Sequence, residues 1–152
     1  MFVNYKKLDI YYLAHEFVLE TYKLCEGFPK LEDNNVTSQL RRAATCLPLN
    51  IAEGSGAGSN KIFLNYLIFC YRSCLEVEAI LLLAKDLQYI TTIQHDNHLS
   101  KLDTFIRKLY RYMQYLESKI SDRKTDKTMY YRQEKWKMEQ DVRTKNDIGK
   151  LC

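Results

Sequence analysis

The chain has 152 residues, enough for one domain with a buried core, and its formal net charge is +4 at pH 7. Only 5 glycines and 2 prolines occur in the whole sequence, which argues against a turn-rich β architecture and favours long helices. The mild positive charge is compatible with a polyanionic partner, and equally with a slightly basic surface that binds nothing.

The sequence predicts a soluble, cytoplasmic protein with no membrane segment. Its N-terminus lacks the apolar stretch and small-residue cleavage site of a signal peptide. The most apolar run, residues 80–84, has only five residues and is too short to cross a membrane. The 5 cysteines are odd in number and show no disulfide framework, so we expect free thiols.

The first predicted helix covers residues 9–27. Gly27 and Pro29 are well placed to end it, because glycine favours helix C-termini and proline cannot continue a helix. The positions expected on its buried side recur at steps of three and four residues and are Ile10, Leu13, Phe17, Thr21 and Leu24.

The second predicted helix begins after Asn34 or Asn35, either of which can cap it. Pro48 lies inside its pattern and predicts a kink, because proline removes a backbone donor and crowds the preceding turn. A glycine-rich turn at residues 54–59 follows, with Ser59 as the expected N-cap of the next helix. The buried side of the second helix is expected to hold Val36, Leu40, Ala43, Ala44, Leu47, Ile51 and Ala52.

The third and fourth predicted helices cover residues 60–87 and 92–123. The main apolar row of the third helix is Phe63, Leu67, Cys70, Cys74, Val77, Leu81 and Ala84. A second row beside it, which predicts a wide buried face, is Leu64, Ile68, Tyr71, Leu75 and Leu82. The row of the fourth helix is Leu99, Leu102, Ile106, Leu109, Met113, Leu116 and Ile120.

These repeats predict the fold class. Sustained steps of three and four residues favour near-parallel packing of helices, and short loops make neighbours in sequence antiparallel. We therefore expect an all-α, antiparallel up-and-down four-helix bundle over residues 1–123. Residues 124–152 hold few aliphatic side chains and many alternating charges, which predicts a polar, flexible C-terminal tail.

The sequence offers no catalytic or metal-binding motif, so we expect neither an enzyme nor a cofactor. It contains no Glu-x-x-His pair of the kind that builds a di-metal centre in a bundle. Cys70 and Cys74 would supply only half of a zinc site and are expected in the core. His95 and His98 are expected in a solvated segment that caps the fourth helix. The glycines of residues 54–58 follow a helix and lack the Gly-Lys-Ser/Thr of a phosphate loop.

Basic residues interleaved with tyrosines on the fourth helix indicate a different kind of function. Tyr110, Tyr112 and Tyr115 could stack on unpaired bases. A solvated face with tyrosines at the bundle margin explains the same pattern, and the residues alone leave both readings open. The candidate nucleic-acid-binding residues are Arg41, Arg42, Lys101, Arg107, Lys108, Arg111 and Lys119.

Two strings on the second helix resemble a known family. They are Thr-Ser-Gln-Leu-Arg-Arg-Ala-Ala at residues 37–44 and Pro-Leu-Asn-Ile-Ala-Glu-Gly at residues 48–54. They resemble the signature of the 23S rRNA-intervening sequence proteins, a four-helix-bundle family related to the accessory variability determinants of diversity-generating retroelements. The resemblance extends over about residues 5–120, with Arg72 standing where the family usually has glycine.

The resemblance implies an antiparallel bundle that assembles into a ring-like homopentamer. For the retroelement members it also implies binding of RNA or DNA and of a reverse transcriptase. The motif residues that the resemblance assigns to structure or assembly are Ser38, Gln39, Asn50, Glu53 and Gly54.

The leading functional prediction is therefore a non-catalytic, oligomeric nucleic-acid-binding accessory protein that assists a retroelement reverse transcriptase. The alternative is a structural or protein-interaction bundle of the intervening-sequence type, with no nucleic-acid role.

Overall fold

The computed structural model describes residues 3–121 of the chain. The predicted tail at 124–152 and the predicted boundary at 123 lie outside these residues. All regular elements of the described part are helical. The elements are the 3-10 turns η1 (Tyr5–Lys7) and η2 (Lys30–Glu32) and the helices α1 (Asp9–Cys25), α2 (Val36–Ser55), α3 (Asn60–Asp86) and α4 (Thr92–Ser121).

Helices that follow one another in the sequence pack antiparallel, and the contacts between them show this. The Cys70 thiol of α3 donates to the Leu47 carbonyl of α2 at 3.5 Å. Further along α2, Gly54 approaches Phe63, which lies earlier on α3. Higher numbers on α2 thus face lower numbers on α3. For α1 and α2, the Val3 amide, which precedes α1, donates to the carbonyl of Ser55 at the end of α2 at 3.1 Å. The start of α1 therefore lies near the end of α2.

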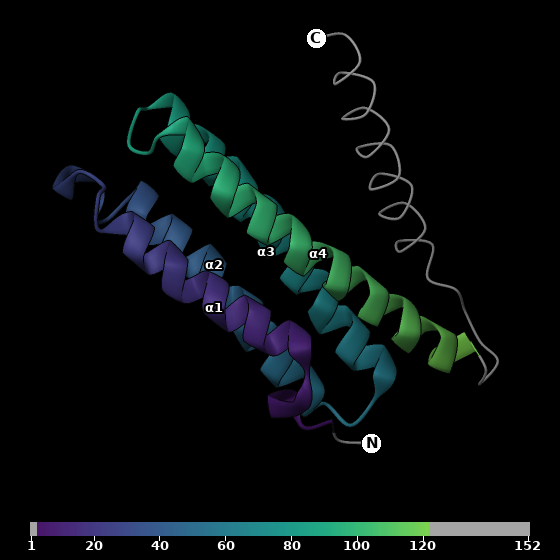
Figure 1. The fold of residues 1–152 in the computed structure, drawn as a ribbon. Helices are drawn as coiled ribbons and strands as arrows, with labels where there is room; N and C mark the ends of the chain where they lie inside the picture. The colour runs from purple at the N-terminus through teal and green to yellow at the C-terminus, as the bar shows by residue number, and fades with distance from the viewer. Residues whose placement is uncertain (1–2, 122–152) are drawn as a thin grey trace, which may run out of the picture. The chain divides into compact units, whose positions relative to one another are not determined.

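The fourth helix closes the bundle by packing against α1 and α3. The rings of Phe17 and His98 lie 6.2 Å apart between α1 and α4, and those of Phe63 and Tyr112 lie 5.6 Å apart between α3 and α4. Figure 1 shows α1 and α4 nearer the viewer, with α2 and α3 behind them. Each helix therefore has two neighbours and one diagonal partner, α1 with α3 and α2 with α4. The predicted four-helix bundle is confirmed.

The core forms mainly along the predicted rows. The predicted members that are only half-buried are Leu13, Ala52, Leu99, Ile106 and Ile120. Every member of the main row of α3, from Phe63 to Ala84, is buried. The second row is buried only in part, because Leu75 and Leu82 remain 43% and 47% exposed. The wide buried face predicted for α3 is therefore wrong over its second half. On α4 the core also contains Phe105, which lies between two members of the predicted row.

The start of α2 is capped by a residue that sequence analysis did not single out. Asn35 occupies the N-cap position, but its side chain does not cap the helix. Instead Glu32, in η2, accepts a bond from the Val36 amide at 3.3 Å and another from Asn35 Nδ2 at 3.0 Å. A carboxylate at a helix N-terminus satisfies an orphan amide and complements the helix dipole. Helix α2 then continues through Pro48 to Ser55.

The junction of α3 and α4 is also held by backbone and side-chain caps. Helix α3 ends in a Schellman motif, with Gln88 at a φ of 62° and the Tyr89 amide donating to the Ala84 carbonyl at 2.9 Å. Helix α4 begins with a reciprocal cap: the Thr91 amide donates to Gln94 Oε1, and the Gln94 amide donates to Thr91 Oγ1. Ser59, at the start of α3, makes no side-chain cap.

Candidate functional site

Four exposed side chains line one side of α4 over its second half. Lys108, Arg111, Tyr115 and Lys119 are separated by three, four and four residues, the spacing of neighbours on one helix face. Lys101 lies two turns earlier on the same side. These five residues are called the α4 basic row. Arg107 is exposed and lies beside the row, one turn before Arg111.

The charges of the α4 basic row are not equally available. Lys101 Nζ donates to Glu20 Oε1 of α1, so this cation is already paired. Arg107, Lys108 and Arg111 form no salt bridge with any residue between 3 and 121. Arg107, Lys108 and Arg111, which lie within two turns of α4, therefore carry charges that are not paired within the described part of the chain.

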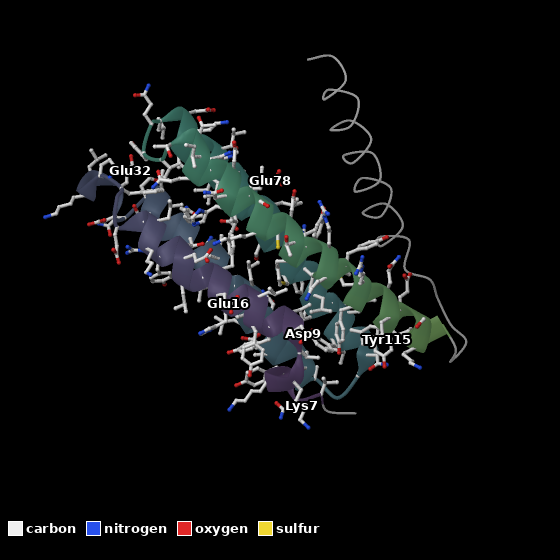
Figure 2. All side chains as sticks on the ribbon, in the orientation of Figure 1. Lys7, Asp9, Glu16, Glu32, Glu78 and Tyr115 are labelled. Atoms are coloured by element: carbon white, nitrogen blue, oxygen red, sulfur yellow. The ribbon has the colours of Figure 1, made fainter. Side chains whose placement is uncertain are left out.

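Three aromatic rings contact one another in series at the end of this row. The Tyr115 ring is 54% exposed and carries Lys119 Nζ at 5.6 Å from its centre. Behind it the Tyr112 ring lies at 5.9 Å and contacts Phe63 of the core. Burial raises the pKa of Tyr112 above its ordinary value. Figure 2 shows Tyr115 toward the end of α4. Of the three tyrosines predicted to stack on bases, Tyr115 is the exposed one, and Tyr110 is half-buried.

The two arginines predicted to join this site lie on α2, the diagonal partner of α4. The guanidinium of Arg41 stacks on the Tyr22 ring at 5.2 Å, and its Nε is buried without a hydrogen-bond partner. Arg42 is exposed, with Nη2 at 3.9 Å from Glu76 Oε1 of α3. The structure therefore does not bring these arginines together with the α4 basic row.

The predicted motif residues of α2 divide into two groups. Gly54 is buried, where a Cβ atom would lie 2.6 Å from Phe63 Cδ2 and 2.7 Å from Tyr66 Cβ. Asn50 is half-buried and donates from Nδ2 to the Cys46 carbonyl at 2.8 Å. Ser38, Gln39 and Glu53 are exposed. Gly54 thus has a packing role within the chain, and the exposed members are available to a partner.

A large apolar surface on α3 was missed by sequence reasoning. Leu87, at the C-cap of α3, and five side chains of the helix are 43–52% accessible. The five, which spread over two flanks of the outer side, are Ile62, Phe69, Leu75, Leu82 and Leu83. They are called the α3 outer face. Helix α3 carries apolar residues on nearly all sides, which is typical of a helix that packs on more than one surface. The presence of apolar residues on more than one side of α3 was the signal available in the sequence.

Three of the residues considered as metal ligands, Cys70, Cys74 and His95, are buried. No cluster of three or more potential metal ligands occurs among residues 3–121. Cys74 is fully buried, and burial raises the pKa of its thiol well above the ordinary value, which keeps it protonated. His95 is buried beside Asp96, with Nδ1 at 2.9 Å from Oδ1, so the predicted solvated setting of His95 is wrong. Packing of α4 against the bundle buries the His95 side chain, while residues 92–94, 96 and 97 are exposed. No helix in the described part is long and apolar enough to span a membrane.

Comparisons with known proteins agree with the observed architecture. The model of the 23S rRNA-intervening sequence protein family matches residues 6–111. A crystal structure from the S23 ribosomal protein family of Bacteroides thetaiotaomicron, a protein of unknown function, is similar in fold with a TM-score of 0.62. Its sequence is 22% identical, and the alignment covers 68% of this chain and 97% of that one. No curated protein matches the sequence.

Proposed function

Because the chain belongs to the 23S rRNA-intervening sequence protein family, we propose that it is a non-catalytic, cytoplasmic oligomer that binds nucleic acid through the α4 basic row. The observation that carries the proposal is the group of cations at Arg107, Lys108 and Arg111, which form no salt bridge with residues 3–121 and lie next to the exposed Tyr115 ring. Cations that track a phosphate backbone beside a stacking ring are the usual means of binding single strands.

The residues of the α4 basic row would make different contacts with the nucleic acid. Lys108 and Arg111 would contact consecutive phosphates, and each neutralised phosphate would release counterions. Tyr115 would offer its face to an unpaired base. Lys101 would contribute less, because its charge is shared with Glu20. Binding would be strongest at low salt and weaker for duplexes, whose bases are already stacked.

We expect the double variant Lys108→Glu/Arg111→Glu to bind a labelled single-stranded RNA at least tenfold more weakly at low salt. The loss of two phosphate contacts should reduce the slope of log affinity against log salt by about 1.4. Fluorescence anisotropy with the full chain measures both quantities.

The matched control is Lys23→Glu/Lys30→Glu, which changes the net charge equally at exposed sites outside the row. This control should retain most of the affinity. Equal losses in the two double variants would show that net charge alone drives binding. No binding by the unmodified chain at low salt would remove the proposal.

A reverse transcriptase is a proposed partner on the family resemblance alone. A reverse-transcriptase gene with paired template and variable repeats beside this gene would support a retroelement role. Location inside an rRNA gene would support the intervening-sequence branch instead.

The second candidate function is protein interaction without nucleic acid, and the α3 outer face favours it. Exposed apolar surface of this kind marks interaction sites on soluble domains. Self-association would cover it, and the exposed residues Gln39, Arg42 and Glu53 of α2 could contribute to the same contact. The homopentamer implied by the family resemblance is one such assembly.

We expect the unmodified chain to have a light-scattering mass that is a multiple of 18.1 kDa, and Phe69→Glu to shift it toward the monomer. Leu31→Glu is the control, because Leu31 is 79% exposed in η2 and outside the α3 outer face. A monomeric wild type would exclude self-association. An oligomer that binds no RNA would favour this second function.

A further inference from the structure

The first cation of the α4 basic row is held by a carboxylate from another helix. Lys101 Nζ donates to Glu20 Oε1 of α1. Within residues 3–121, Glu20 is the carboxylate that forms a salt bridge with a member of this row. The row therefore has a paired cation at its first position, and the cations at Lys108 and Arg111 are not paired within the same part of the chain.

The ion pair between Lys101 and Glu20 is open to solvent. The side chain of Lys101 is 54% exposed and that of Glu20 is 38% exposed. Oε2 of Glu20 is buried and has no hydrogen-bond partner within the described residues, so the carboxylate is held through Oε1. Exposed ion pairs contribute little free energy, because water screens the charges and both side chains lose conformational freedom. A phosphate group can therefore compete with Glu20 for Lys101.

The surface of α4 between Lys101 and Lys108 is suited to a nucleic-acid backbone. Ser100 and Thr104 are exposed there, and hydroxyl groups commonly hydrogen-bond to phosphates and sugars. The acidic residue of this stretch, Asp103, is half-buried. Lys101 and Lys108 are seven residues apart, which corresponds to about 10.5 Å along the helix. Release of Lys101 from its ion pair would thus extend the binding surface by about two turns.

We propose that Glu20 limits nucleic-acid binding by competing with phosphate for Lys101. This inference rests on the proposed binding of nucleic acid by the α4 basic row and adds its regulation. While the ion pair is closed, a bound strand contacts the row from Lys108 to Lys119. When a phosphate displaces Glu20, Lys101 joins the contact. The ligand that displaces Glu20 is a single strand long enough to extend from Lys119 to Lys101, eighteen residues or about 27 Å of helix.

Glu20→Gln in the full chain tests this competition, because it removes the charge and keeps the size of the side chain. The probes are single-stranded RNAs of about four and about twelve nucleotides, followed by fluorescence anisotropy over a range of salt concentrations. We expect the variant to bind the longer RNA about three- to fivefold more tightly than wild type. The slope of log affinity against log salt should become steeper by about 0.7, the value for one further phosphate contact.

Glu16→Gln is the matched control. Glu16 is exposed one turn earlier on α1 (Figure 2) and forms no salt bridge within residues 3–121. It changes the net charge equally and should tighten binding by less than twofold, as should Glu20→Gln with the shorter RNA. In a Lys101→Gln background, Glu20→Gln has no cation to release. Its gain there should fall to that of Glu16→Gln.

The outcomes separate this proposal from the proposed function. Equal gains for Glu16→Gln and Glu20→Gln would overturn the competition and leave nucleic-acid binding standing, because net charge would explain both results. A full gain that persists in the Lys101→Gln background would overturn it as well. If neither wild type nor Glu20→Gln binds either RNA at low salt, the proposed function fails and its regulation fails with it.

Discussion

Gly54→Ala should lower the free energy of unfolding by about 2 kcal/mol, because it places a methyl group where α2 and α3 touch. A Cβ atom at this position would lie 2.6 Å from Phe63 Cδ2 and 2.7 Å from Tyr66 Cβ. The Tyr66 atom is next to the backbone and cannot rotate away, so the two helices must separate. Overpacking of this kind costs about 3 kcal/mol at the upper end, and the better helix propensity of alanine offsets about 1 kcal/mol.

Gly56→Ala is the matched control for this prediction. A Cβ atom at Gly56 would meet only the Glu53 carbonyl oxygen at 3.6 Å, an ordinary contact, and the backbone there has an αR conformation. Its stability should change by less than about 0.5 kcal/mol. Urea unfolding followed by circular dichroism measures both variants. Equal stability of Gly54→Ala and wild type would show that α2 and α3 can separate at no cost.

Glu32→Ala should destabilise the fold by about 2 kcal/mol, because one carboxylate holds the start of α2 and the turn before α4. Glu32 is 6% exposed and accepts bonds from the Val36 amide, from Asn35 Nδ2 and, at 2.8 Å, from the Tyr89 hydroxyl. Alanine leaves all three donors without this partner. Asp33→Ala, which removes the neighbouring exposed carboxylate, should be close to neutral in the same denaturation assay.

A second measurement on Glu32→Ala distinguishes the contact with Tyr89 from the helix cap. The bond to Glu32 raises the pKa of Tyr89, with burial and the carboxylate charge adding to the effect. Since the folded pKa exceeds the unfolded value of about 10, this bond stabilises the fold below pH 10. Its contribution is lost as the pH rises through the folded pKa. The variant should return the Tyr89 pKa toward its ordinary value in an ultraviolet titration, with Tyr89→Phe identifying the band. An unchanged titration would contradict the contact.

Only part of the candidate site could be predicted from sequence. The spacing of Lys108, Arg111, Tyr115 and Lys119 along one helix made their shared side predictable. The pairing of Lys101 with Glu20 was not predictable, since those residues are 81 positions apart and meet only when α1 and α4 pack. The separation of Arg41 and Arg42 from α4 likewise follows from the order of helices around the bundle.

The sequence by itself determined the four helices and the main buried row of α3, because helical periodicity and helix-stop residues act locally. The tertiary structure decided which sides of those helices are covered. Helix α3 offers several apolar rows, and packing against α2 and α4 buries Leu64 and Tyr71 while leaving Leu75 and Leu82 exposed. Burial depends on partners far away in sequence. For that reason the tight contact at Gly54, the Glu32 cap and the exposure of Leu75 and Leu82 became visible only in the folded chain.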